Sequence, residues 1–397
     1  MKVFYVTMKF PAMSETFAGH DVLTLYQKGI DISVHSLLNK GKYAERFKKE
    51  RRLEKIWITH NNFFAMLKGL IYGIRRVNLL IDLIVWIIKT NLKNKNHLQK
   101  SIFLIPRAVD IFNTIEKERP DVVHLFWGHF PSIVGYLVEK YHPDITVTIF
   151  LGAYDLEMNY NGTKPVACSA KAVFTHAKCN VPIIKRLGVN PENITVCYRG
   201  IDLERFSLES IPKKINKRIV CASRLIESKG VDDVIKGFSK INKKYPDSTL
   251  VILGDGEKKA ELVKMVKSLN LSSAVDFKGH VNQDVLFQEM KKAEIFMLLS
   301  KKQSERLPNV VKEAMLAKCL CIVSETPGIE ELVENNGTGY IVKSGNFNKM
   351  YCIADNIFTN KVNRKPIVEK AFLHITNNFD IKKLMDNYIG IWESDKK

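Results

Sequence analysis

The sequence contains few cysteines and no long apolar run. Seven cysteines occur in 397 residues, and no two of them form a Cys-x-x-Cys pair. This count excludes a disulfide-stapled scaffold, and the closest pair, Cys319 and Cys321, lies in an apolar run typical of a buried strand. No stretch of about 18 apolar residues is present, which predicts a chain that does not span a membrane. We therefore expect a reduced, cytoplasmic protein that begins with a strand and has no signal peptide.

Several motifs of cofactor and metal sites are also missing. The sequence has no Gly-x-x-x-x-Gly-Lys-Ser/Thr phosphate loop and no Gly-x-Gly-x-x-Gly fingerprint. Gly254-Asp255-Gly256 alone is explained equally well by a turn at a strand end. No two aspartates are spaced i, i+2, and no His/Cys cluster has zinc-ligand spacing. The sequence therefore predicts a protein that works without a cofactor and without a metal ion.

Short apolar runs alternate with longer amphipathic segments along the chain, which predicts parallel sheets covered by helices on both faces. The predicted strands are residues 3–8, 32–38, 122–126, 146–151, 194–198, 218–223, 249–253, 275–278, 295–298 and 320–323. The polar, proline-containing stretch 207–217 interrupts this alternation and is typical of a linker.

This pattern predicts an α/β protein with two doubly wound, Rossmann-like domains. The amino-terminal domain covers residues 1–206 and contains a basic helical insert at about 40–105, and the carboxyl-terminal domain covers 218–379. Residues 380–397 are predicted to form a helix that returns to the amino-terminal domain. Ligands of such sheets bind outside the carboxyl ends of the strands, so we expect the site in the cleft between the domains.

Positive charge is concentrated in one region. The chain carries a net charge of +19, and residues 40–107 contain sixteen basic and four acidic residues. Nucleic-acid binding is disfavoured, because this region has no aromatic RNA-binding signature, zinc-finger spacing or arginine-rich repeat. Two interpretations remain, a solvated basic face and an anionic membrane surface. Residues 63–88, where apolar blocks alternate with cations, favour the membrane surface.

The strongest local pattern is SERLPNVVKEAM, residues 304–315, which follows the predicted strand IFMLL and opens a helix. Pro308 suits the first turn of a helix, and the amides of Asn309 and Val310 are then free to bind a phosphate. Glu305 and Glu313 are spaced to reach two ends of one elongated ligand. Alternatively, Glu305 only favours the helix start, and Glu313 is a solvated helix residue.

A second pattern is ASRLIESKGVDDVIKGF, residues 222–238. Arg224 ends a predicted strand and Lys229 precedes a helix, so both cations are expected at the ligand-binding edge of the sheet. There they would clamp a diphosphate through charge-assisted hydrogen bonds. Two solvated loop cations are the alternative.

Together with VILGDGE, VDFKGHV, PGIEELV and NGTGYIV, these two patterns resemble the carboxyl-terminal half of a family four retaining glycosyltransferase of the GT-B fold. The stretch KFPAMSETFAGHDVLTLYQKG, residues 9–29, is similar to the subgroup that builds colanic acid, other bacterial exopolysaccharides and O-antigens. The resemblance covers nearly the whole chain except residues 40–105.

The resemblance implies a role for each matching residue. Arg224 and Lys229 match the pair that binds the donor phosphates, Glu313 the carboxylate on the nucleotide ribose, and Glu305 a residue beside the donor sugar. The other residues that we predict to bind the donor are Gly254, His280, Val281, Arg306, Leu307, Asn309 and Val310. The acceptor-binding residues are Ser14, Glu15, Thr16, His129 and Asp155.

Two positions depart from the family pattern. Arg306 stands where the family usually has glycine, and it either narrows the sugar pocket, contacts the donor or points outward. Leu151-Gly152 replaces a His-Gly pair near the reaction centre, and His129 in WGHFPS is the nearest substitute. The alternative for His129 is a helix-entry residue bound only to backbone. His124, inside a predicted strand, is expected to be a buried structural residue.

The resemblance therefore implies a retaining, metal-independent glycosyltransferase. It would move a sugar from a nucleotide diphosphate-sugar to a lipid-linked saccharide during bacterial surface polysaccharide synthesis. The basic region would hold it at the inner face of the cell membrane, with Glu305, Arg224, Lys229 and His129 at the reaction centre. A nucleotide-sugar epimerase or phosphorylase of the same fold, or a non-catalytic partner in polysaccharide assembly, are the alternatives.

Overall fold

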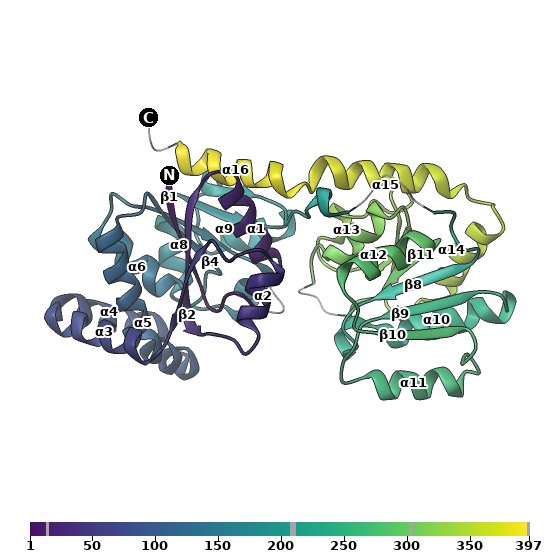
Figure 1. Ribbon diagram of the computed structural model, residues 1–397, viewed down its shortest axis with the longest axis horizontal. Coiled ribbons are helices and arrows are strands. Elements are labelled where there is room, and N and C mark those ends of the chain that lie inside the picture. The colour runs from purple at the N-terminus through teal and green to yellow at the C-terminus, as the bar shows by residue number, and fades with distance from the viewer. Residues whose placement is uncertain (13–15, 207–211, 302–304, 395–397) are drawn as a thin grey trace. The chain divides into compact units, whose positions relative to one another are not determined.

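The computed structural model describes residues 1–12, 16–206, 212–301 and 305–394. It divides the chain into two compact units (Figure 1). Unit 1 comprises residues 1–200 and 381–397, and unit 2 comprises residues 201–380. Each unit contains one parallel sheet covered by helices, so the expected α/β class with two Rossmann-like sheets is confirmed.

The sheet of unit 1 has seven parallel strands in the order β3-β2-β1-β4-β5-β6-β7. The order reverses between β1 and β4, as in a doubly wound sheet. The strands are β1 (Lys2–Thr7), β2 (Asp31–Asn39), β3 (Trp57–Asn61), β4 (Val122–Phe126), β5 (Thr146–Phe150), β6 (Ala172–Thr175) and β7 (Ile194–Val196). β1, β4 and β5 are buried along nearly their whole length, which explains their continuous apolar runs.

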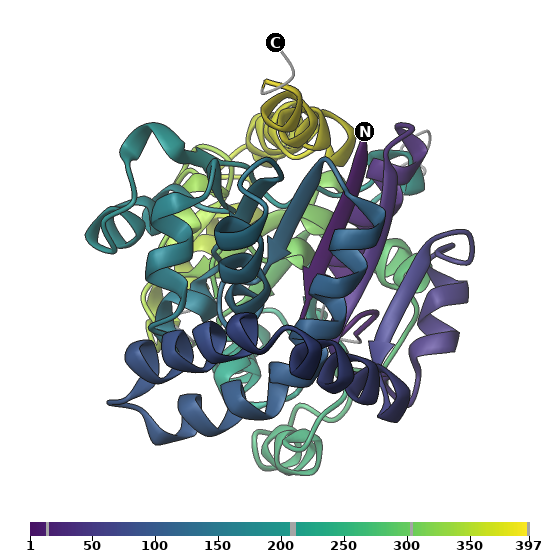
Figure 2. The same cartoon turned by 90° about the vertical axis from the view of Figure 1, so that its left-hand side faces the viewer.

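Helices cover both faces of this sheet. They are α1 (Thr16–Gln27), α2 (Ala44–Glu50), α3 (Phe63–Arg75), α4 (Val77–Asn91), α5 (Lys95–Glu118), α6 (Ser132–Tyr141), α7 (Ala153–Met158), α8 (Thr163–Ser169), α9 (Val181–Arg186) and α16 (Ile381–Glu393). α5 and α6 share one core with the sheet, and α1 and α16 share the other. α3 and α4 pack on α5, and Figure 2 shows these helices, drawn in blue, in front of the sheet.

The carboxyl-terminal helix α16 is part of unit 1. The ring of Tyr388 stacks on Phe174 at 4.0 Å between centroids, and the indole N–H of Trp392 donates to the Thr148 hydroxyl at 3.1 Å. Both side chains are buried against the sheet. The last helix of the chain therefore completes the core of the first unit.

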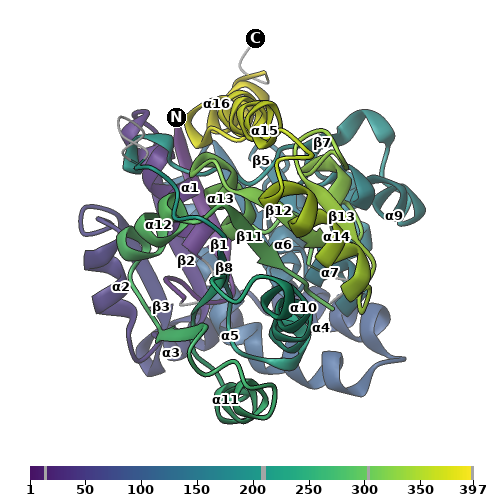
Figure 3. The same cartoon turned by 90° about the vertical axis from the view of Figure 1, so that its right-hand side faces the viewer.

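The sheet of unit 2 has six parallel strands in the order β10-β9-β8-β11-β12-β13, four of which are labelled in Figure 3. The strands are β8 (Arg218–Ala222), β9 (Thr249–Leu253), β10 (Val275–Gly279), β11 (Ile295–Leu298), β12 (Leu320–Ser324) and β13 (Tyr340–Val342). β8 and β11 lie at the centre, and the strand order reverses there. Their carboxyl ends are the expected position of a ligand.

The helices of unit 2 are α10 (Val231–Lys244), α11 (Lys259–Ser268), α12 (Gln283–Lys292), α13 (Asn309–Leu316), α14 (Phe347–Phe358) and α15 (Arg364–Asn378). Four of them, α10 to α13, connect consecutive strands, and α14 and α15 follow the last strand, β13. α10, α11 and α14 share an apolar core with the strands. α13 lies between α12 and α15, and it also contacts β11 and β12. α13 thereby places the second half of the SERLPNVVKEAM motif against the centre of the sheet.

Two details of the expected organisation differ from the structure. The boundary between the units falls after residue 200, not 206, because the Ile201 amide donates to the Phe379 carbonyl at 2.9 Å and Phe206 packs on Phe287. The insert at about 40–105 is not purely helical, because WITHN forms edge strand β3 beside β2. The first five residues of the predicted linker, 207–211, lie outside the described residues.

Candidate functional site

The predicted donor residues of unit 2 follow the carboxyl ends of neighbouring strands. Arg224 comes two residues after β8, and its side chain is exposed. Lys229 ends a short 3₁₀ turn, residues 227–229, that continues into α10. The predicted order of strand, cation-bearing loop and helix is therefore present.

Gly230 brings this loop close to the central strand β11. Its φ is +62°, and a Cβ atom there would lie 1.9 Å from the carbonyl oxygen of Leu299. The Lys301 amide donates to the Ser228 carbonyl at 2.9 Å, and the Ser300 hydroxyl oxygen lies 3.1 Å from the same carbonyl oxygen. A side chain at position 230 would force the loop away from β11.

Lys229 and Glu305 form an ion pair at this edge of the sheet. The ammonium of Lys229 binds one carboxylate oxygen of Glu305, and the Ser300 hydroxyl donates to the other. The Lys229 and Glu305 side chains are 18% and 15% exposed, so solvent still reaches the pair. A cation and a carboxylate are thus held together where the parallel strands end.

Glu313, on α13, is buried. Burial raises the pKa of its carboxyl from 4.5 to about 7, and the hydrogen bond from Gln283 partly offsets this rise. The Gln283 amide donates to Oε1 of Glu313 at 2.9 Å. Glu313 is therefore a buried group that can change protonation near neutral pH, and it is not the solvated helix residue of the alternative interpretation.

The start of α13 differs slightly from the prediction. Pro308 is the N-cap, with ψ near 130°, and the helix begins at Asn309 rather than at the proline. The first amides of a helix have no acceptor within it, so the amides of Asn309 and Val310 can still bind an anion. Arg306 and Leu307 just before the cap are buried, so Arg306 does not point outward into solvent.

The remaining predicted donor residues lie on two neighbouring loops. Gly254 has a φ of +137°, and a Cβ atom there would lie 1.9 Å from the Ser223 carbonyl oxygen. Its amide donates to the Gly279 carbonyl at 2.8 Å, which joins the loops that follow β9 and β10. His280 is exposed and Val281 is half-buried in the second loop.

His129 and Asp155, predicted separately as acceptor residues, form a buried pair in unit 1. The distance between His129 Nδ1 and Asp155 Oδ1 is 2.7 Å. The Asp155 carboxylate also accepts from the amides of Gly128 and Gly152, each at 2.9 Å. His129 is therefore held by a carboxylate, and its Nε2 is the ring atom left to contact a ligand.

A pocket of about 490 Å³ opens beside this pair. Its lining is mostly apolar and includes Met8, Leu38, Gln99, Lys100, Phe103, Leu104, His129, Phe130, Tyr154 and Met158. His124 lies elsewhere, buried inside β4, where its Nδ1 is 2.9 Å from the Thr148 hydroxyl and burial lowers its pKa to about 3. The expectation that His124 is a buried structural residue is thus confirmed.

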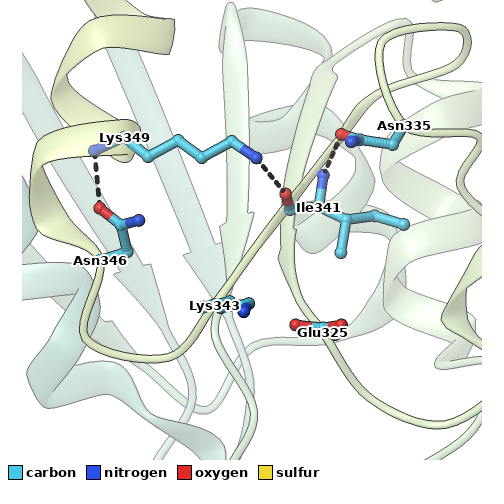
Figure 4. A pocket seen from close by; sticks show the side chains of 6 residues that line it. All are labelled: Glu325, Asn335, Ile341, Lys343, Asn346 and Lys349. Carbon is cyan, nitrogen blue, oxygen red and sulfur yellow. Dashed lines mark hydrogen bonds between the residues drawn. The ribbon is translucent and has the colours of Figure 1, made fainter.

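Another pocket, of about 530 Å³, lies in unit 2 (Figure 4). Its lining residues are Glu325, Asn335, Ile341, Lys343, Asn346 and Lys349, and none of them belongs to the predicted donor set. The Lys349 ammonium donates to the Ile341 carbonyl, and the Asn335 side chain accepts from the Ile341 amide. These hydrogen bonds connect the wall of the pocket to edge strand β13. The chemistry predicted for the chain does not involve this pocket.

Three further predicted acceptor residues are consecutive in the sequence. Ser14 and Glu15 lie outside the described residues, and Thr16 is the first residue of α1. Conversely, Ser300 and Gln283 contact the predicted carboxylates but were missed in the sequence. Ser300 comes two residues after the strand IFML, so its place near a strand end was the available signal. Within the described residues, no cluster of three or more His, Cys, Asp or Glu side chains could hold a metal ion.

Comparison with known proteins identifies glycosyltransferases. Residues 204–372 match the family described as glycosyl transferases group 1. The amylovoran biosynthesis glycosyltransferase AmsK of Erwinia amylovora is 23% identical over 96% of both chains. A Campylobacter jejuni N-acetylgalactosaminyltransferase, named for an N-acetylgalactosamine-N,N'-diacetylbacillosaminyl-diphospho-undecaprenol, is 29% identical over 46% of this chain and 49% of its own length. Apart from AmsK, the chain spans about half the length of the first curated relatives that it matches.

Solved structures share the whole fold at low identity. Anabaena Alr3699/HepE, crystallised in complex with UDP, has a TM-score of 0.73 and 15% identity, and the match covers 99% of this chain and 100% of that one. The two parallel sheets thus have the GT-B fold of glycosyltransferases. The matched residues 204–372 lie entirely within unit 2, so that unit carries the similarity to the glycosyl transferases group 1 family.

Proposed function

We propose that this protein transfers a sugar from a nucleotide diphosphate-sugar to a saccharide acceptor. The observation that carries the proposal is the cluster of Lys229, Glu305 and Ser300 at the carboxyl ends of the central strands of unit 2. The match of residues 204–372 to glycosyl transferases group 1 and the binding of UDP by the similarly folded HepE support a nucleotide donor in this unit. Arg224 and Glu313 complete the proposed donor site.

The proposed chemistry needs no metal ion or other cofactor. Negative charge grows on the diphosphate as the glycosidic bond breaks, and the side chains of Arg224 and Lys229 stabilise it together with the amides at Asn309. Attack from the same face of the sugar retains its configuration, and the leaving phosphate assists removal of the acceptor proton. Glu305, which binds Lys229, orients the sugar ring.

The acceptor is proposed to bind unit 1. The pocket beside His129 has a mostly apolar lining with a few polar groups, which suits an amphipathic molecule such as a lipid-linked saccharide. The names of AmsK and of the Campylobacter transferase support surface polysaccharide synthesis and a lipid-linked acceptor, respectively. Because such an acceptor resides in a bilayer, the protein would work on the cytoplasmic face of the membrane as a peripheral protein. No described helix is long and apolar enough to cross that bilayer.

Thermal unfolding with UDP, GDP, ADP or CMP tests the donor site. A nucleotide at 100 times its dissociation constant stabilises the folded state by about 2.7 kcal/mol, which corresponds to a shift of several degrees. We expect one nucleotide to shift the wild type and to leave the Arg224→Ala/Lys229→Ala variant unshifted. A wild type that none of the four shifts would contradict the proposal.

The buried Arg306 favours one alternative, a non-catalytic assembly partner whose donor pocket is blocked. Failure to bind any nucleotide would support that alternative. Product analysis distinguishes a transferase from an epimerase or phosphorylase of the same fold. Release of free nucleotide diphosphate only when a saccharide acceptor is present is expected of a transferase.

A further inference from the structure

Helices α3 and α4 present large apolar side chains to the outside of unit 1. Phe63, Phe64 and Ile74 on α3 are 74%, 71% and 70% exposed, and Val77 and Ile81 on α4 are more than half exposed. Soluble proteins expose single apolar residues routinely, but successive turns of two neighbouring helices form a continuous apolar surface. The remaining exposed members of this outer apolar face are Leu67, Leu70, Ile71, Val85 and Ile88.

The small residues of α3 face inward instead. Ala65, Gly69 and Gly73 recur every fourth residue and are buried. A Cβ atom at Gly69 would lie 1.7 Å from the carbonyl oxygen of Pro106 on α5, so the two helix backbones are in close contact. α3 cannot rotate to bury its bulky side, because no residue larger than glycine fits where Gly69 meets α5. The packing of the unit therefore fixes the outward direction of the apolar face.

Unpaired cations border this face. Lys68 and Arg75 lie seven residues apart on one edge of α3, and Lys89 lies in the last turn of α4. Among the described residues, no ion pair includes any of these three side chains. The surrounding region, residues 40–107, has sixteen basic and only four acidic residues. An apolar centre with a basic border matches the apolar interior and anionic headgroups of a bilayer.

The two helices are too short to span that bilayer. α3 has 13 residues and α4 has 15, and no described helix is long and apolar enough to cross a membrane. Helices with one apolar face and cations beside it lie in the plane of the interface, with the apolar face below the headgroups.

We propose that α3 and α4 form an insertion surface that docks unit 1 on an anionic lipid bilayer. The apolar face enters the acyl boundary, and Lys68, Arg75 and Lys89 contact lipid phosphates. This inference deepens the membrane location in the proposed function. It is tested without nucleotide or acceptor, so a failure here would leave the donor site as proposed.

Vesicle flotation with the full-length protein tests the surface. Vesicles of phosphatidylcholine alone and of equal parts phosphatidylcholine and phosphatidylglycerol are compared at low and high salt. The apolar variant is Phe63→Ser/Phe64→Ser/Ile74→Ser, and the charge variant is Lys68→Gln/Arg75→Gln/Lys89→Gln. Leu373→Ser, at a 56% exposed leucine on α15 of unit 2, is the matched control. All positions are exposed, and equal melting temperatures establish that the variants are folded.

We expect wild type and the control to bind the anionic vesicles alike. The apolar variant should bind at least about tenfold more weakly. The charge variant should lose about fivefold per cation on anionic vesicles and little on neutral ones. High salt should weaken wild-type binding without abolishing it, because screening does not act on the apolar contact.

Three results would overturn the proposal. They are a wild type that floats with neither vesicle, an apolar variant that binds as well as the wild type, and a control that loses as much binding as the apolar variant. Sedimentation equilibrium without lipid tests whether a second copy of the chain, rather than a bilayer, covers the apolar face. A wild-type dimer that the apolar variant converts to monomer, together with no vesicle binding, would assign the face to a second copy of the chain.

A second set of substitutions, in α4, controls for the case that the substitutions in α3 weaken binding only by disturbing α3 itself. Ile81→Ser/Val85→Ser changes only α4, whose buried Leu79 and Leu83 stay in the core. We expect this variant to weaken vesicle binding in the same direction. Unchanged binding would restrict the insertion surface to α3 and contradict the two-helix proposal.

Discussion

A single buried carboxyl, that of Glu313, links the candidate donor site to pH. Burial raises its pKa to about 7 in the folded chain, against 4.5 for the exposed group. Between these values the folded chain holds a proton that the unfolded chain has lost, so the free energy of unfolding falls as pH rises from 4.5 to 7. The loss is about 3 kcal/mol and is complete above pH 7.

Glu313→Gln removes this ionisation, so we expect it to remove the corresponding loss of stability. Urea unfolding at pH 5 and pH 8 measures the difference between wild type and variant. Contributions of other groups, such as Glu139 with its pKa also raised to about 7, cancel in that difference. A difference that does not change with pH would show that Glu313 is already ionised at pH 5.

Asp155 holds three hydrogen-bond donors at once. Its carboxylate accepts from the amides of Gly128 and Gly152 and from His129. Asp155→Asn keeps the shape but replaces one acceptor oxygen by an NH₂ group, which leaves a buried donor without a partner. We expect the free energy of unfolding to fall by about 1–3 kcal/mol. Glu157→Gln, at an exposed position of the same helix, is the control and should unfold in urea as the wild type does.

The residue types of the site were predictable from the sequence, but their partners were not. Motif order named Lys229 and Glu305 individually, yet their ion pair depends on how close Gly230 brings the loop to β11. Likewise, His129 and Asp155 are 26 residues apart, and only the pairing of β4 with β5 brings their loops together. Contacts between loops depend on strand order, which local sequence patterns do not specify.

At the scale of elements, the close packing of α3 on α5 can be tested by substituting glycines of α3. Gly69→Ala places a methyl group against the Pro106 carbonyl, where a Cβ would lie at 1.7 Å, so α3 must move. Gly73→Ala is the matched control, because its nearest neighbour atoms are side-chain carbons at 3.7 Å.

We expect Gly69→Ala to lower the melting temperature. We expect Gly73→Ala to leave it unchanged or to raise it slightly, since alanine favours a helix by about 1 kcal/mol over glycine. Equal melting temperatures for the two variants would mean that α3 does not pack closely on α5.

Most strands that the sequence revealed are buried inside the sheets, although the edge strands β7 and β10 were predicted as well. β1, β4, β9 and β11 read as apolar runs because helices cover both of their faces. β3 was missed because WITHN is a half-exposed edge strand with polar residues. β6 and β13 were also missed; they have four and three residues, and strands of the same length, β11 and β7, were predicted, so length alone does not explain the omission.

At the scale of the whole molecule, an uneven distribution of tryptophan allows the two units to be observed separately. All four tryptophans, Trp57, Trp86, Trp127 and Trp392, belong to unit 1. The proposed donor residues Arg224, Lys229, Glu305 and Glu313 all belong to unit 2. Tryptophan fluorescence therefore follows the unfolding of unit 1 alone, whereas calorimetry follows both units.

A nucleotide that binds only unit 2 stabilises only the unfolding transition of that unit. We expect the nucleotide that shifts the wild type, UDP in the first instance, to raise one calorimetric transition by several degrees and to leave the fluorescence midpoint nearly unchanged. The Arg224→Ala/Lys229→Ala variant serves as control. The nucleotide should shift neither its calorimetric transition nor its fluorescence midpoint. Equal shifts of the fluorescence midpoint and of the calorimetric transition would mean that the nucleotide also binds unit 1, or that the two units unfold as one.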